Sequence, residues 1–108
     1  MDDLNRAIFI KDQAVGIIAP QHHDRSMCFS NLGTALRTRF EQTEEMDNLN
    51  RAITMYEQAV TSALNSDPNV AMYLNNLGIT IWMRFDRTGT IDNLDKAIQM
   101  YEGRCVHA

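Results

Sequence analysis

The chain is poor in the residues that commonly build metal sites, redox sites and cross-links. Its 108 residues include two cysteines, two prolines and one tryptophan. Cys28 and Cys105 do not form a Cys-x-x-Cys pair, so the sequence indicates neither a zinc site nor a dithiol redox motif. Isolated thiols are typical of a reducing compartment, in which disulfides rarely persist. We therefore expect a cytoplasmic protein without a metal ion or another cofactor.

Long apolar runs and basic clusters are also missing. Every apolar run is far shorter than the ~20 residues that a membrane-spanning helix needs, and the N-terminus does not resemble a secretory signal. The formal net charge is −4, and no cluster of Lys and Arg offers a surface for phosphates. These absences argue against membrane and nucleic-acid partners. The apolar fraction of 44% is that of an ordinary globular chain.

The sequence does contain a phrase that recurs with a fixed period. It is MDDLNRAI in its first copy, and its three copies are offset by 45 residues, at 1–8, 46–53 and 91–98. A second phrase, Asn-Leu-Gly, keeps the same offset at 31–33 and 76–78. The first and second stretches of 45 residues are identical at 17 positions. A period of this length is typical of a helical repeat array, in which each unit buries its apolar face on the next.

The spacing of apolar residues predicts five helices. Steps of three and four residues between apolar positions indicate helices, and Asp, Pro and Gly residues mark their ends. We expect one helix at 1–19, a full repeat of two helices at 25–64, and a full or truncated repeat at 69–104, followed by a tail at 105–108. The predicted N-caps are Asp24, Asp47, Asp67 (followed by Pro68) and Asp92. The predicted turns are 41–46 and 88–90.

Gly33 and Gly78 occupy the same place in the two repeats, each inside a predicted helix. A glycine in a helix interior is destabilising by about 1 kcal/mol relative to alanine. We therefore expect a neighbouring helix to approach the backbone closely at this place.

These residues resemble the tetratricopeptide repeat. The first helix of a repeat in that family carries an aromatic residue, then Leu-Gly, then a large residue, as at Phe29, Leu32-Gly33 and Leu36. The second helix carries Ala, an aromatic residue and Ala, as at Ala52, Tyr56 and Ala59. The period of 45 residues exceeds the family's usual length of about 34 residues. The long variant is similar to arrays in large fungal proteins, where it accompanies caspase-like or nucleotide-binding domains.

The resemblance implies an all-α fold of antiparallel helix pairs that stack as a superhelix. If A and B denote the first and second helices of a repeat, the five predicted helices follow the order B-A-B-A-B. The A helices of such an array line a concave groove.

A second stripe beside the core positions of the two A helices is the candidate surface for a protein or peptide partner. It comprises Met27, Asn31, Thr34, Met72, Asn76, Ile79, Trp82 and Met83. Trp is enriched at binding hot spots, and Met adapts to varied surfaces. The alternative is that Trp82 and Met83 pack against the next helix. The family's carboxylate-clamp subclass uses cations at these positions, and they are missing here.

Other polar clusters have simpler interpretations. His22-His23-Asp24 lacks an evident third metal ligand, so we interpret it as a turn and a helix cap. The acidic segment of Glu41, Glu44 and Glu45 has no partner base, so it indicates a solvated loop. Cys28 lies off the core stripe, as expected of a partly exposed thiol without catalytic function. We expect no enzymatic activity.

Two functional hypotheses remain. In the first, the chain is a non-catalytic interaction scaffold that binds a peptide or a neighbouring domain in its groove. In the second, it is a structural spacer, or it self-associates through its end helices, because Phe9, Ile10 and Ile17 place apolar side chains off the core stripe of the first helix. The first hypothesis requires that Met72, Ile79 and Trp82 be exposed.

Overall fold

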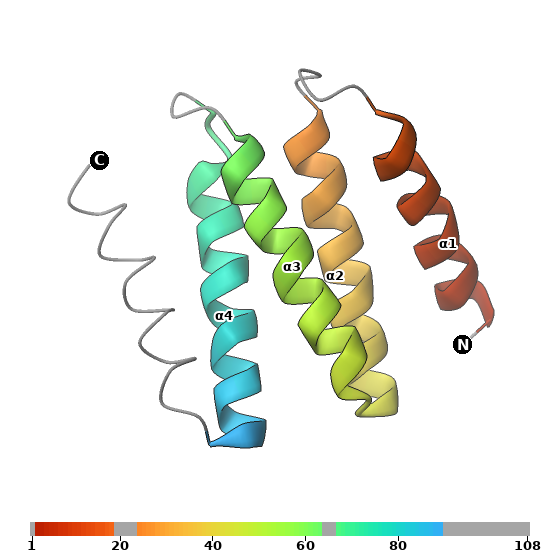
Figure 1. The fold of residues 1–108 in the computed structure, drawn as a ribbon, viewed down its shortest axis with the longest axis vertical. Coiled ribbons are helices and arrows are strands. Elements are labelled where there is room, and N and C mark those ends of the chain that lie inside the picture. Colours follow the sequence, from red (N-terminus) through yellow and green to blue (C-terminus); the bar gives the residue numbers. More distant parts are fainter. Residues whose placement is uncertain (1, 19–23, 64–66, 90–108) are drawn as a thin grey trace.

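The structure is a computed structural model, and it describes residues 2–18, 24–63 and 67–89. These residues form helices and short connections without a strand, so the predicted all-α class is confirmed for them. The helices are α1 (Asp2–Ile17), α2 (Arg25–Thr43), α3 (Met46–Ser62) and α4 (Val70–Thr88) (Figure 1). The fifth predicted helix and the tail lie outside the described residues. None of the described helices is long and apolar enough to cross a membrane.

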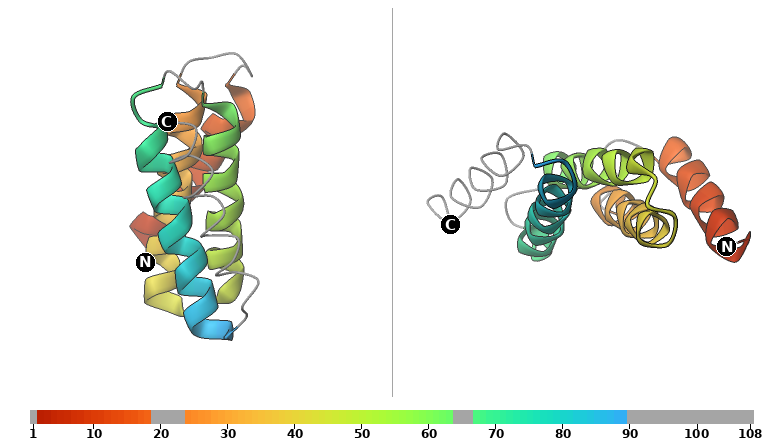
Figure 2. Two further views of the ribbon diagram at one scale, coloured as in Figure 1. Left: turned by 90° about the vertical axis from the view of Figure 1, so that its left-hand side faces the viewer. Right: turned by 90° about the horizontal axis from the view of Figure 1, so that it is seen from below.

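Consecutive helices run antiparallel and pack side by side (Figure 1). α2 and α3 form a hairpin and share the most extensive contact, whereas α1 packs on α2 and α4 packs on α3. Figure 2 shows α2 and α4 on one side of the molecule and α3 on the other. α2 and α4 therefore lie on the same side of the fold, and α3 packs against both of them from the other side.

The core follows the apolar stripes read from the sequence. The most regular stripe is on α3, whose buried residues recur at steps of three and four: Leu49, Ala52, Ile53, Tyr56, Ala59 and Val60. Facing them, α2 and α4 bury their Leu residues with little or no exposed surface. Burial of one such aliphatic side chain contributes roughly 1.5–3 kcal/mol. The core thus joins all four helices through α3 and α2.

Helix α2 is longer than predicted. The predicted turn over 41–46 would end this helix by residue 40, but the helix continues to Thr43. Glu44 then adopts a left-handed conformation, with φ 62°, and its N–H donates to the carbonyl of Phe40. Polar residues such as Glu41 favour an exposed last turn of a helix as readily as a loop, because both are solvated. Polarity alone therefore placed the end too early.

Two of the predicted N-caps are displaced. Asp47 lies in the first turn of α3, and the N-cap is Glu45. Asp67 accepts a hydrogen bond of 2.8 Å from the backbone N–H of Asn69, which makes a turn before α4 and leaves Asn69 as the N-cap. Asp24 is the N-cap of α2, as predicted, although its side chain makes no capping hydrogen bond. An Asp near a helix start fits several positions, since it also favours the positive end of the helix dipole.

The structure tests the predicted turn at Gly89 and the predicted close approach at Gly33. Gly89 ends α4 with φ 71°, which agrees with the predicted turn at this point. At Gly33 the neighbouring helix does approach closely, but through a side chain instead of its backbone. A Cβ atom added to Gly33 would lie 3.0 Å from the ring of Tyr56 on α3. The glycine therefore makes room for the tyrosine.

Candidate functional site

The eight candidate groove residues all lie on α2 and α4, the two helices that share one side of the molecule (Figure 2). The structure places five of them on the surface: Asn31, Thr34, Met72, Ile79 and Trp82. The other three are half-buried: Met27, Asn76 and Met83. The predicted stripe is therefore at least partly accessible along both helices.

The exposed residues in the α2 half of the stripe, Asn31 and Thr34, are polar. Thr34 and the hydroxyl of Tyr56 share a hydrogen bond of 2.8 Å, which ties the surface of α2 to the core of α3. Burial raises the pKa of Tyr56 above its usual value, partly offset by this hydrogen bond and by the nearby guanidinium of Arg37. The tyrosine is therefore neutral at physiological pH and serves as a hydrogen-bonding group. Its function here is to position α2 against α3.

The α4 half of the stripe exposes two aliphatic side chains on one face. Met72 exposes 43% of its surface and Ile79 exposes 42%, seven residues apart and thus on the same face of the helix. Their repeat equivalents on α2 are Met27 and Thr34, so the exposed surface changes from partly polar to apolar between the two helices. Exposed aliphatic side chains aligned on one face are a common feature of protein-binding surfaces.

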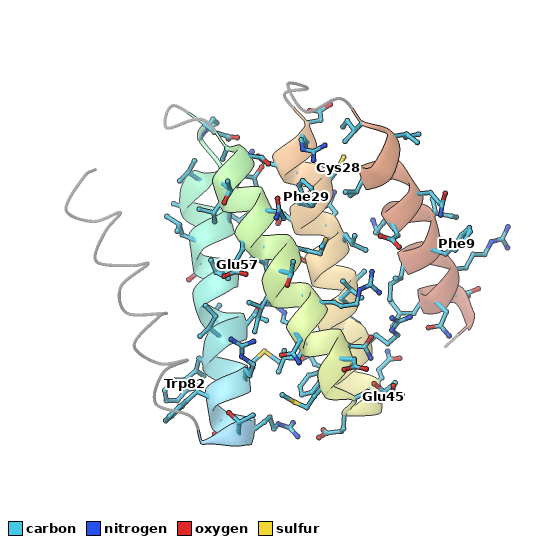
Figure 3. The ribbon with its side chains drawn as sticks, viewed as in Figure 1. Phe9, Cys28, Phe29, Glu45, Glu57 and Trp82 are labelled. Carbon is cyan, nitrogen blue, oxygen red and sulfur yellow. The ribbon has the colours of Figure 1, made fainter. Side chains whose placement is uncertain are left out.

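Trp82 lies beside this face instead of at its centre. It exposes 50% of its surface, and its ring lies 5.3 Å from that of Phe85 between centroids. Its repeat equivalent is Arg37, which points from α2 towards α4 and donates to the hydroxyl of Thr80 at 3.4 Å. Figure 3 shows Trp82 on the side of α4 that faces away from α2. Trp82 therefore extends the apolar surface around the flank of α4.

An ion pair links the ends of α2 and α4. At the end of the two helices, Arg87 of α4 forms a bidentate ion pair with Glu44. The same guanidinium lies over the ring of Phe40, 5.3 Å from its centroid. The acidic segment is therefore not only a solvated loop, because one of its members links α2 to α4. The sequence offered no signal for this pair, which depends on how the two helices align.

A second set of polar residues connects consecutive helices. Arg39 donates from Nε to the buried Oδ1 of Asn48 at 2.8 Å, and from Nη1 to Asn5 at 3.0 Å. Arg84, 45 residues later, donates to Asn50 at 3.1 Å. In the sequence these two arginines recur at the 45-residue offset, each followed by a phenylalanine. Their recurrence was the available signal that they have a structural function.

Of the remaining candidate residues, the structure describes Cys28 but not the two histidines. Cys28 is a half-buried free thiol, as expected. His22 and His23 lie outside the described residues. Among residues 2–18, 24–63 and 67–89, no three His, Cys, Asp or Glu side chains come together as a metal site would require. The described residues of α2 and α4 therefore offer exposed side chains for contact with a partner.

Comparison with models of known protein families, with curated proteins and with solved structures gives no match.

Proposed function

We propose that the chain is a non-catalytic interaction scaffold built from tetratricopeptide-like helix pairs. Support comes from the polar contacts that obey the sequence period. The Arg39–Asn5 and Arg84–Asn50 bonds each span 34 positions, and the second bond lies 45 positions after the first, as stacked copies of one unit require. In this proposal α2 and α4 are A helices, α1 and α3 are B helices, and the array curls into a superhelix with the A helices on its concave side.

The observation that carries the proposal is the exposure of Met72 and Ile79 on one face of α4. The hypothesis required these two residues and Trp82 to be exposed, and all three are. These apolar side chains lose contact with water when a partner covers them, which stabilises the complex by about 25 cal/mol for each Å² buried. The polar residues Asn31 and Thr34 on α2 then provide hydrogen bonds at the rim. The proposed ligand is an apolar peptide or the surface of a neighbouring domain.

The test is selection of binding peptides from a library of random peptides displayed on phage, with the full chain as bait. We expect enriched peptides with aliphatic or aromatic residues, whose affinity falls at least about tenfold in the double variant Met72→Asp and Ile79→Asp. Thr54→Asp on the exposed side of α3 is the matched control and should change the affinity little. Failure to enrich peptides, or equal binding by the groove variant, would contradict the proposal.

Self-association is the second candidate, and the surface of α1 favours it. Phe9, Ile10 and Ile17 are among the most exposed large apolar side chains of the described residues. Light scattering across a dilution series tests this candidate. A molecular mass that stays monomeric at high concentration would exclude it.

A further inference from the structure

Helices α2 and α4 lie on one side of the molecule without an extensive contact of their own. The extensive contacts among the described residues join consecutive helices, and α3 packs on both α2 and α4. Because α2 and α4 run in the same direction, their C-terminal ends lie at the same end of the molecule (Figure 1). Their separation at this end therefore depends on α3 and on side chains that reach from one helix to the other.

The main apolar core stops short of this end. Its last members are Leu36 on α2 and Ile81 on α4, each roughly two turns before its helix ends. Phe40 is also buried, but it lies outside this cluster. The first turns of α4, in contrast, contribute Val70 and Tyr73 to the core. The C-terminal ends of α2 and α4 therefore depend on contacts other than the main core.

Arg87 of α4 supplies such a contact. Its guanidinium forms a bidentate ion pair with Glu44, the residue that follows the last turn of α2. The same group lies over the buried ring of Phe40 on α2, 5.3 Å from its centroid. A bidentate pair of arginine and carboxylate constrains geometry as well as attracting the two groups. One side chain of α4 thus holds the end of α2 at a carboxylate and at an aromatic ring.

The backbone of Glu44 indicates that its side chain has a function. Glu44 has φ 62°, in the left-handed region that glycine adopts readily and other residues disfavour. Its repeat equivalent, 45 residues later, is Gly89, which ends α4 with φ 71°. A glutamate thus stands where the other repeat has the residue best suited to the backbone. Disfavoured backbone conformations cluster at functional positions, and the contact that this glutamate adds is the ion pair with Arg87.

We propose that Arg87 and Glu44 form a latch that sets the separation of α2 and α4 at one end of the proposed groove. The two side chains are 45% and 58% exposed, so dissolved salt screens their attraction. When the pair breaks, the last turns of α2 and α4 move apart while the turns that the core holds stay in place. The width of the groove therefore responds to ionic strength. The latch rests on the proposed function for the groove, but it is measurable without a partner.

The test measures distances between two nitroxide labels by double electron–electron resonance in the full chain, with both native cysteines replaced by serine. Labels at Gln42→Cys and Asp86→Cys report on the latch end, since both residues are exposed in the last turns of α2 and α4. Labels at Asn31→Cys and Ala71→Cys, also exposed, report on the first half of each helix. The two label pairs distinguish movement of the ends from loosening of the whole fold.

Glu44→Gln removes the charge and keeps the size of the side chain. The distance at the latch end should then increase by at least about 2 Å, the upper size of a common helix shift, and the other distance by less than about 1 Å. Glu45→Gln removes the charge of the next exposed residue and is the matched control, in which neither distance should change. With Glu44 intact, about 1 M NaCl should also increase the distance at the latch end, because the screening length falls to about 3 Å.

Glu44→Gly separates the latch from the stability of the backbone. Glycine accepts the left-handed conformation without strain, so the thermal midpoint, followed by circular dichroism, should not fall below that of Glu44→Gln. The distance at the latch end should nevertheless increase as it does in Glu44→Gln, because the carboxylate is missing in both variants.

An unchanged distance at the latch end in both Glu44 variants would overturn the proposal. An equal increase in Glu45→Gln would show a general effect of charge, and an increase at both label pairs would show a looser fold, so either result would also overturn it. These distances do not depend on peptide binding. Failure to select binding peptides would therefore contradict the proposed function alone.

Discussion

Arg39 donates a hydrogen bond of 3.0 Å to Asn5 across 34 positions of sequence, from α2 to α1. The same bond recurs with Arg84 and Asn50, from α4 to α3, at 3.1 Å. Each arginine thus joins one helix, α2 or α4, to the helix before it. Because both partners of the bond recur at the 45-residue offset, this contact between helices has the period of the sequence.

Replacement of Arg39 by Met should destabilise the chain by about 1–3 kcal/mol, because the buried Oδ1 of Asn48 loses its donor. The effect should exceed that of Asn5→Ala, which removes only the exposed bond to Asn5. Urea denaturation followed by circular dichroism measures both changes. Equal midpoints for wild type and Arg39→Met would show that the arginine does not contribute to stability.

Ala52→Arg should unfold the described fold, while Ala7→Arg should leave it folded. The two alanines are repeat equivalents, but Ala52 has no exposed surface and Ala7 is half-buried. A long charged side chain at Ala52 would be forced between α3 and α2, where neither space nor water is available. At Ala7 the same side chain can extend into solvent. Thermal unfolding of both variants tests this difference, and an unchanged midpoint in Ala52→Arg would contradict it.

The sequence predicted the class of the fold and the path of its core more accurately than the ends of its helices. Apolar spacing located α1 to α4, since burial of one face requires that spacing whatever the neighbours are. The ends of the helices depend on local hydrogen bonds, which several neighbouring residues can make. Asp67, for example, binds the N–H of Asn69 and shifts the start of α4 to Val70.

Apolar spacing also predicted part of the candidate surface. Periodicity placed Met72 and Ile79 on one face, and both are exposed. The position of Trp82 on the flank follows from its equivalence to Arg37, but only after the direction of Arg37 is known. The pairing of Arg87 with Glu44 could not be predicted. These residues are 43 positions apart, and their contact depends on how α2 and α4 align.

Gly33→Ala should destabilise the chain, although alanine is the better helix former by about 1 kcal/mol. The new Cβ would lie 3.0 Å from the ring of Tyr56, which is fully buried and held by Thr34, so the ring cannot retreat without loss of packing. Gly16→Ala is the matched control. It should stabilise α1, because nothing lies within 4 Å of its Cβ position. Chemical denaturation of the pair tests the prediction, and a gain in stability for Gly33→Ala would contradict it.

Tyr56→Phe should change how the free energy of unfolding depends on alkaline pH more than it changes that free energy at neutral pH. Near pH 7 it keeps the ring and loses one hydrogen bond to an exposed threonine, so we expect a loss of at most about 1 kcal/mol. Burial raises the pKa of Tyr56 in the folded state, so the unfolded chain releases this proton first, near pH 10. The contribution of the group is therefore complete below about pH 10 and is lost as the pH rises towards the folded-state pKa.

In the variant, the free energy of unfolding should fall less steeply between about pH 9 and pH 11 than in the wild type. Some dependence should remain, because burial also raises the pKa of Tyr73. Urea denaturation at a series of alkaline pH values measures the slope. Tyr73→Phe is the matched comparison, and the double variant should have the smallest slope of the three. Identical slopes in wild type and Tyr56→Phe would mean that the hydroxyl of Tyr56 titrates alike in the folded and unfolded chain, which its burial between α2 and α3 argues against.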